Sequence, residues 1–283
     1  MSALIQQTAE WHEMRRSKIG ASDAAIIMEE SPWKTPFQLW CQKVQSGSIP
    51  EKSIALLRGI ELEPIARQRF MDMTGICVSP DVIINPNNNW MMASLDGIDE
   101  EKKNIVEIKC PGKEDHSSAS EGIIPRKYYP QLQHQLEVCA LDMAYYFSFD
   151  GIEGVIIKIY RDDKYIKNMI SKEKEFWDRI QDFRPPMLIE RDYVYKDNEI
   201  WNNTASEWKN LNRQIIQLES RRDELKDILV SQCAQRNSRG GGLKVSKVLR
   251  KGAIGYGEIP ELIGIDLESY RKKPIEYWKI GTE

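Results

Sequence analysis

The chain has 283 residues, a length that suits one large domain or two smaller ones. With 41% hydrophobic and 29% charged residues and no apolar run long enough to span a membrane, we expect a soluble, cytoplasmic protein without a signal peptide. The net charge of −3 is by itself no argument for a nucleic-acid partner. The five cysteines form no Cys-x-x-Cys pair, which disfavours a disulfide framework, a zinc site and an iron–sulfur cluster.

Residues 8–30 predict two short helices separated by a break at Gly20. Ser22 or Asp23 can cap the second helix, and Arg15 precedes it. A capped helix start beside an arginine is a candidate phosphate site. An ordinary capped helix with surface cations explains the same residues, and the stretch alone favours that simpler interpretation.

Residues 51–74 have helical spacing, interrupted by Pro64, which would kink the helix or start a new one. Glu61 or Glu63 could face inward as a carboxylate. Periodicity does not choose between the two.

Four strands at 76–78, 82–84, 90–94 and 105–109 predict an antiparallel meander. Glu107 and Lys109 project to one face of the last strand, and Asp96, beside a Gly turn, can come alongside Glu107. Two convergent carboxylates bind Mg²⁺, and a neighbouring lysine can orient a water, which is the equipment for phosphodiester hydrolysis. Alone, the pattern is weak, because a turn and a solvated strand face produce it too.

The sequence from residue 113 to residue 183 predicts a polar loop followed by helices and strands. We expect a loop at 113–127, a helix at 128–142, strands at 144–149 and 155–160, and a helix at 161–183. The helix after the glutamate strand would cross over and return the chain to the same sheet. The predicted class is α/β (α+β), with a central mixed sheet flanked by helices.

Past residue 190 the sequence pattern changes from alternating helices and strands to one long, highly charged helical pattern. We therefore expect a core at 1–190 and an extension at 191–283. Residues 204–234 predict a long helix with near-heptad spacing, which could be an arm, a partner helix or a lid. A Gly-rich hinge is expected at 237–242. Cations interleaved with aromatics then suggest either a nucleic-acid surface or a solvated subdomain. These residues are Arg236, Arg239, Lys244, Lys247, Arg250, Lys251, Tyr256, Tyr270, Tyr277 and Trp278.

In order, the motifs of residues 8–185 resemble those of the lambda-exonuclease-like, YqaJ-type viral recombinases of the PD-(D/E)xK nuclease superfamily. Six motifs occur in the family's order, and their order is more specific than any one of them. They are Trp11-His12-x-x-Arg15 with Gly20-Ala21-Ser22, Gly59-x-x-x-Glu63-x-x-Ala66, Ser94-Leu95-Asp96-Gly97, Glu107-Ile108-Lys109-Cys110-Pro111, Tyr129-x-Gln131-x-Gln133, and Arg161-Asp162-Asp163-Lys164-Tyr165. The chain departs from the family at Leu95, where a proline often precedes the aspartate.

The resemblance implies a PD-(D/E)xK core and a role for each matched residue. Asp96, Glu107 and the carbonyl of Ile108 would bind Mg²⁺, and Glu63, rather than Glu61, would support a second ion. Mn²⁺ can substitute in such sites. The resemblance further implies that the attacking water is positioned by Lys109, that Gln131 lies beside the metals, and that the 5′-phosphate and DNA are bound by Arg15, Ser22 and Gln133.

The implied activity is 5′–3′ digestion of linear double-stranded DNA. It would release 5′-mononucleotides and leave 3′ single strands for phage-type recombination. The resemblance further implies a homotrimer that works with a single-strand annealing protein. Of the later cations, Lys244, Lys247, Arg250 and Lys251 are candidate DNA contacts. A related nuclease of other polarity, an endonuclease and an inactive DNA-end-binding module are the alternatives.

Overall fold

The computed structural model describes residues 6, 8–45, 54–255, 259–262, 264, 265, 267–270, 272, 278, 280 and 281. The chain divides into two compact units, Met1–Val194 and Tyr195–Glu283. The aromatic residues Tyr256 and Tyr277 of the predicted nucleic-acid surface lie outside the described residues. Within the described ranges, no helix is long and apolar enough to cross a membrane.

The first unit is built on a mixed sheet, which has six strands in the part of the chain that the structure describes. The strands are β1 (Ile19–Gly20), β2 (Ser79–Ile84), β3 (Met91–Ile98), β4 (Ile105–Lys109), β5 (Met143–Phe149) and β6 (Gly154–Tyr160). Their order is β1-β3-β4-β5-β6, and β2 also pairs with β3. The predicted antiparallel meander is confirmed for β2, β3 and β4, and so is the crossover, because β4 and β5 are parallel.

Seven α-helices accompany the sheet in the described part of this unit. They are α1 (Ala9–Ser17), α2 (Ala21–Ile27), α3 (Pro36–Val44), α4 (Ile54–Thr74), α5 (Lys113–Ser120), α6 (Tyr129–Cys139) and α7 (Asp163–Gln181). Short 3₁₀ turns occur at Arg126–Tyr128 and Glu190–Asp192. Side chains of Thr8, Thr35 and Asp162 accept hydrogen bonds from the first turns of α1, α3 and α7. These caps satisfy backbone donors that a helix start leaves free.

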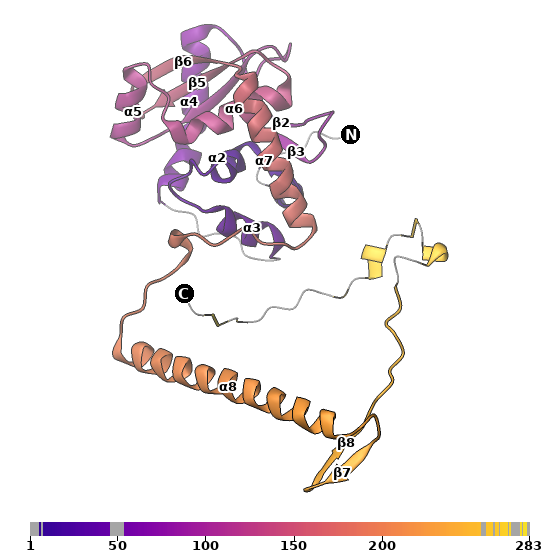
Figure 1. Cartoon of the computed structure of the whole chain (residues 1–283). Coiled ribbons are helices and arrows are strands. Elements are labelled where there is room, and N and C mark those ends of the chain that lie inside the picture. Colours follow the sequence, from indigo (N-terminus) through magenta and orange to yellow (C-terminus); the bar gives the residue numbers. More distant parts are fainter. Residues whose placement is uncertain are drawn as a thin grey trace. The chain divides into compact units, whose positions relative to one another are not determined.

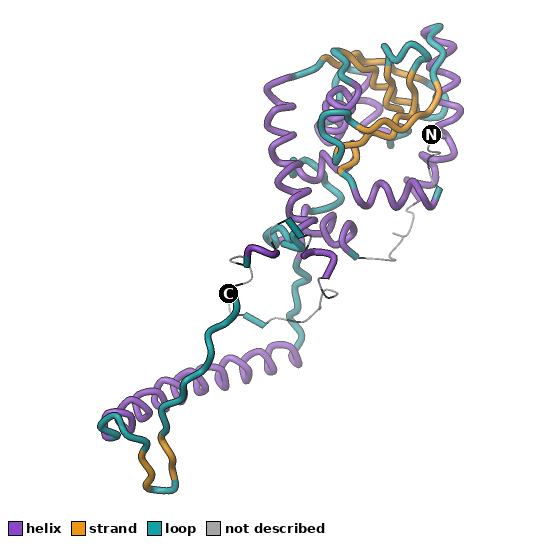
Figure 2. Tube along the Cα trace, turned by 90° about the vertical axis from the view of Figure 1, so that its right-hand side faces the viewer, coloured by secondary structure: helices purple, strands orange, loops and turns teal. Residues whose placement is uncertain are grey.

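Helices cover both faces of the sheet (Figures 1 and 2). On one face, Phe70 of α4 belongs to an apolar cluster that contains Val106 and Ile108 of β4. On the other, Leu132 of α6 clusters with Ile105. Because side chains alternate along β4, Glu107 projects to the same face as Ile105, which is the face that α6 covers. The predicted mixed sheet flanked by helices is confirmed.

Two local predictions are wrong. The loop expected at 113–127 begins with α5, a polar helix that buries only His116 and Ala119, so its sequence carries little apolar periodicity. The strand expected at 76–78 is irregular, and β2 starts at Ser79. At Pro64, which is exposed, α4 continues and no new helix starts, which leaves the kink as the prediction there.

The second unit contains α8 (Glu199–Gln232) and the hairpin β7 (Ser238–Gly240) and β8 (Leu243–Val245), and 3₁₀ turns at Pro260–Leu262 and Leu267–Tyr270. The long helix is confirmed, although it begins earlier than predicted, where the Asn198 side chain accepts from Trp201 N. The predicted Gly-rich hinge is wrong. Gly241 and Gly242 have φ of 56° and 77° and form the tight turn of the hairpin, a backbone shape that favours glycine.

Candidate active site

The β3–β4 hairpin brings Asp96 and Glu107 together. Its register pairs Gly97 with Val106, which sets Asp96 opposite Glu107. The backbone nitrogen of Ile108 donates to Asp96 Oδ2 at 2.8 Å. Gly97 lies within β3 and not in a turn, contrary to the sequence-based expectation. A Cβ there would meet Val106 Cγ1 at 2.7 Å, so a glycine is needed for the strands to approach this closely.

Glu107 is almost fully buried, at 1% exposure, and is held by three side-chain donors. Its Oε1 accepts from Lys109 Nζ at 2.5 Å and from Gln131 Nε2 at 2.5 Å. Its Oε2 accepts from Gln135 Nε2. Gln131 and Gln135 are four residues apart on α6 and therefore share one face of that helix. The donors offset the cost of burying the carboxylate and fix its orientation.

The third carboxylate comes from α4. Glu63 is half-buried, whereas Glu61 is exposed. Arg67 donates to Glu63 Oε1 and, through Nε, to the backbone oxygen of Asp96 at 2.6 Å. Arg67 thus joins the α4 carboxylate to the aspartate strand. Arg67 is not among the residues predicted from the sequence, although its position four residues after Glu63 on one helix is a usable signal.

Burial and crowding disturb the protonation of this cluster. Burial, with the nearby Glu107 carboxylate adding to it, raises the pKa of Asp96 well above its usual range. Burial also raises the pKa of Glu63. For Lys109, burial lowers the pKa, but the carboxylates of Glu107 and Asp96 outweigh it and leave the pKa raised. The cluster therefore concentrates more negative charge than Lys109 and Arg67 neutralise.

This surplus of carboxylate oxygen fits a hard divalent cation. Among the residues that the structure describes, no three His, Cys, Asp or Glu side chains are grouped so that they would hold a metal ion by themselves. Mg²⁺ is commonly bound by one or two carboxylates, with waters and substrate phosphates completing its shell. A site made of two opposed carboxylates and a neighbouring carbonyl suits that mode of binding.

The Arg15–Ser22 pair is linked through Trp11 to β3, the strand that carries Asp96. Arg15 Nη2 donates to Ser22 Oγ at 2.6 Å, and the guanidinium lies 4.8 Å from the centroid of the Trp11 ring. Trp11 Nε1 donates to Ser94 Oγ at 2.8 Å. Ser94 stands two residues before Asp96 on β3, next to an irregularity in the pairing of β3 with β2, where the three residue steps from Leu95 to Ile98 oppose the two from Ser79 to Asp81.

A buried ion pair shapes the backbone beside Arg15. Lys43 Nζ lies 2.6 Å from Asp23 Oδ2, and both side chains are buried. Lys43 also donates to the carbonyls of Arg15 (2.6 Å) and Lys18 (2.7 Å), and Asp23 accepts from Gly20 N at 2.9 Å. From the sequence, Asp23 is expected only as a helix cap. No local pattern linked it to a lysine twenty residues later.

Gln133, predicted to contact DNA, points into the protein. It is fully buried. Its Nε2 donates to Tyr160 O at 2.9 Å, and its Oε1 accepts from Asp162 N at 2.9 Å. This position does not support the DNA-contact prediction. Gln135, which is not among the predicted site residues, reaches Glu107 instead.

The predicted cations of the extension, Lys244, Lys247, Arg250 and Lys251, are all exposed and lie in the second unit. Lys244 is on β8, and the Lys247 backbone nitrogen donates to Asn237 Oδ1 at 2.9 Å.

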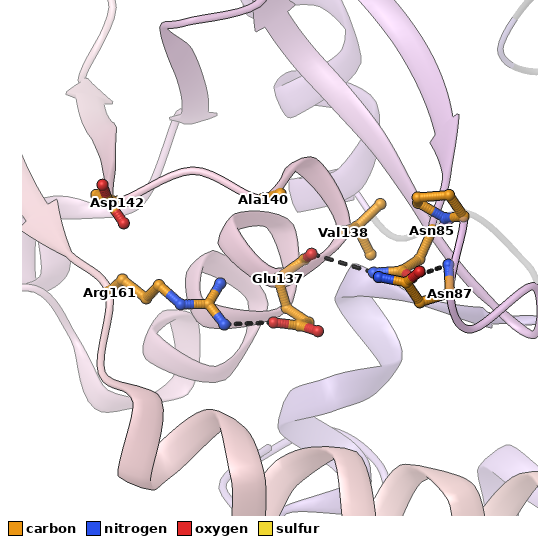
Figure 3. Close-up of a pocket in the computed structure, with 8 residues that line it drawn as sticks. Asn85, Asn87, Glu137, Val138, Ala140, Asp142 and Arg161 are labelled. Carbon is orange, nitrogen blue, oxygen red and sulfur yellow. Dashed lines mark hydrogen bonds and ion pairs between the residues drawn. The ribbon is translucent and has the colours of Figure 1, made fainter.

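A separate cavity of about 290 Å³ lies at the carboxyl end of α6 (Figure 3). Glu137, Ala140 and Arg161 are among its lining residues, and the Arg161–Glu137 ion pair (2.5 Å) crosses one side of it. It shares no lining residue with the carboxylate cluster. The cavity is therefore distinct from the carboxylate cluster at the β3–β4 hairpin.

A mixed sheet that sets an aspartate on one strand against Glu-x-Lys on the next, with a helical glutamate beside them, defines the core of a PD-(D/E)xK nuclease. Residues 10–142 match the model of the YqaJ-like viral recombinase domain. The chain is also 32% identical to the uncharacterized protein YqaJ of Bacillus subtilis (strain 168) over 222 residues, which cover 74% of this chain and 69% of that protein. The chain belongs to the YqaJ-like viral recombinase family.

Solved structures agree with this assignment. The alkaline exonuclease LHK-Exo from Laribacter hongkongensis is 27% identical, with a TM-score of 0.55, and the match covers 62% of this chain and 94% of that one. LHK-Exo has also been solved in complex with dAMP, with the same similarity to this chain. The part of this chain without a counterpart in LHK-Exo is more than a third of its length.

Proposed function

We propose that this protein is a Mg²⁺-dependent exonuclease that digests one strand of linear double-stranded DNA from its 5′ end. The opposition of Asp96 and Glu107 beside Lys109 carries the proposal, because it is the arrangement that metal-assisted phosphodiester hydrolysis needs. The solved relative LHK-Exo is an exonuclease and binds dAMP, a mononucleotide, which supports release of mononucleotides here.

Asp96, Glu107 and the Ile108 carbonyl would hold Mg²⁺, and Glu63 would support a second ion; Mn²⁺ can replace either. When bound, the metal lowers the pKa of a water and neutralises charge on the attacked phosphate. The protein's own contribution is orientation. Gln131 and Gln135 hold the Glu107 carboxylate, and Arg67 holds Glu63 against β3.

Lys109 is placed to orient the attacking water and to stabilise negative charge at the phosphate. Its ammonium stays charged because Glu107 and Asp96 keep its pKa raised. It also lies 5.3 Å from the centroid of the Tyr128 ring, a cation–π contact that restricts where the ammonium can move.

Arg15 and Ser22 would bind the 5′-terminal phosphate. A guanidinium is suited to phosphate, and here the Trp11 ring and the Ser22 hydroxyl hold it in place. Because Trp11 is bonded to Ser94 on the strand that carries Asp96, the distance from the 5′ phosphate to the attacked bond would be fixed, which gives a one-nucleotide step.

In this proposal the product is a 3′ single strand for homologous recombination inside a bacterial host. A single-strand annealing protein would be the partner, and a homotrimer would enclose the DNA. Lys244, Lys247, Arg250 and Lys251 would contact the DNA backbone, since all four are exposed.

One assay tests the proposal. A linear duplex labelled at either the 5′ or the 3′ end, with 5′-phosphate or 5′-hydroxyl ends, is incubated with Mg²⁺ or EDTA. We expect the 5′ label to appear at once as mononucleotide, only with Mg²⁺, and faster from phosphorylated ends. Internal fragments as first products would indicate an endonuclease. Binding without cleavage would indicate an inactive end-binding module.

A further inference from the structure

Trp33 is a large aromatic residue that the first unit displays to solvent. It is 64% exposed and stands in the turn between α2 and α3. A single exposed apolar side chain is common on protein surfaces and needs no special explanation. What distinguishes Trp33 is the way its backbone is held and the neighbours of its ring.

The turn that carries Trp33 is firmly held. The hydroxyl of Ser31, which is buried, accepts from the backbone nitrogens of Trp33 (3.3 Å) and Lys34 (3.4 Å). Arg191 donates to the carbonyls of Ser31 and Pro32. These bonds order the turn, so that the indole is presented in one place and little entropy remains to be lost on binding.

The ring of Trp33 belongs to a series of ring and cation contacts that ends at Lys109. Lys127 Nζ lies 5.0 Å from the Trp33 centroid and 5.4 Å from that of Tyr128. The centroids of Trp33 and Tyr128 are 6.3 Å apart. Lys109 Nζ lies 5.3 Å from the Tyr128 centroid. Trp33 is therefore linked through the Tyr128 ring to the lysine that is proposed to act on the phosphodiester.

Charge around this site is mixed. Lys127 pairs with Asp115 at 2.7 Å, and the exposed Arg126 lies 3.3 Å from Glu30. The ion pair with Asp115 restricts the position of the Lys127 ammonium, which keeps its cation–π contact with the Trp33 ring. An aromatic surface backed by cations beside a phosphodiester site is the arrangement that stacks nucleobases in single-strand binding proteins.

We propose that Trp33, backed by Lys127, is a stacking platform for a nucleobase whose face is uncovered at a DNA end. Within a duplex both faces of every base are covered by its neighbours, so a rigid exposed indole can stack only on a terminal or unpaired base. The platform would therefore add affinity for ends and not for duplex in general. This inference rests on the proposed function, because it assigns a ligand to the same site.

The test compares Trp33→Ala, Trp33→Phe and, as a matched exposed aromatic, Tyr160→Ala, which is 67% exposed on β6. Affinity is measured in EDTA by fluorescence anisotropy, with an internally labelled short linear duplex competed by unlabelled linear duplex or relaxed closed-circular duplex. Hydrolysis plays no part in this readout. Cleavage of linear duplex by the wild type with Mg²⁺ is measured separately, so a failure of the proposed function is visible on its own.

We expect Trp33→Ala to weaken binding of linear duplex about tenfold, in line with the loss of one stacked base. Trp33→Phe should recover most of that affinity, and Tyr160→Ala should not alter it. Circular duplex should bind all four proteins equally, which also shows that the variants are folded. Wild-type affinity for linear duplex in Trp33→Ala, or an equal loss for circular DNA, would overturn the inference.

Discussion

The amide of Gln135 donates to Oε2 of Glu107, the oxygen opposite the one that Lys109 and Gln131 contact. Gln135 is fully buried and comes from α6, while Glu107 comes from β4. The Glu107 carboxylate is therefore held from the α6 side by a residue that has no exposed surface.

Replacing Gln135 with leucine should leave Glu107 less well oriented for a metal. We expect an activity loss of roughly 10–100-fold at limiting Mg²⁺, the usual effect of removing a partner of a metal ligand. Saturating Mg²⁺ should restore part of it. Titration of activity against Mg²⁺ measures this.

Gln133→Leu is the control, because Gln133 is equally buried but bonds only to backbone of residues 160 and 162. It should lower stability without moving the Mg²⁺ midpoint. Equal midpoint shifts in both variants would contradict the assignment.

The Trp11–Ser94 hydrogen bond should couple the Arg15–Ser22 pair, the proposed 5′-phosphate site, to the carboxylate cluster. Trp11→Phe keeps an aromatic ring under Arg15 but removes the N–H donor. We expect it to reduce the preference for 5′-phosphorylated ends about fivefold, the equivalent of one hydrogen bond of about 1 kcal/mol. Ser94→Ala should do the same. The double variant should be no worse than either single one, since both remove one interaction. Fully additive losses would show that the bond does not couple the two sites.

Asp99 should make the stability of the β3–β4 hairpin depend on pH. Its carboxylate accepts from the backbone nitrogens of Lys103 (2.7 Å) and Asn104 (2.9 Å) and from Asn104 Nδ2. Slight burial acts to raise the pKa of Asp99, but these hydrogen bonds outweigh it and leave the pKa lowered. A lowered carboxyl pKa adds stability above the unfolded value of about 3.9, and that stability is lost as pH falls through the folded pKa.

We therefore expect Asp99→Ala to unfold more easily than wild type at pH 7, by about 1 kcal/mol. The difference should shrink below about pH 4. Urea unfolding at several pH values tests this, with the exposed neighbour Glu100→Ala as control. A difference that stays constant down to pH 2.5 would mean that the carboxylate charge is not responsible.

The four cations of the extension should contribute by pairing with DNA phosphates. Replacing Lys244, Lys247, Arg250 and Lys251 with glutamine should weaken DNA binding in a salt-dependent way, and the slope of log K against log salt should fall by about one unit for each phosphate that is no longer neutralised. The control replaces four exposed cations of α8, namely Lys209, Arg213, Arg221 and Lys226. If the two quadruple variants have the same slope, Lys244, Lys247, Arg250 and Lys251 are not preferred DNA contacts.

The placement of Glu107 and Lys109 could be predicted from the sequence because strand alternation is local. The two residues had to share a face of β4, and their hydrogen bond in the structure follows from that. The polar helix α5 could not be predicted from apolar periodicity because it buries only two side chains. The roles of Gln135 and of the Asp23–Lys43 pair could not be predicted for another reason. Their partners lie 28 and 20 positions away, and only the packing of α6 on the sheet and of α3 beside α2 brings them together.

The central claim is that the Asp96–Glu107 pair binds the metal that hydrolyses DNA, and Asp96→Asn tests it most directly. Asparagine nearly keeps the shape of aspartate but removes a charge that burial and Glu107 already disfavour, so folding and DNA binding should persist. Mg²⁺-dependent release of mononucleotides from linear duplex should fall about a thousandfold, equal to several kcal/mol of transition-state stabilisation. Cleavage by Asp96→Asn at the wild-type rate, with DNA affinity unchanged, would contradict the account.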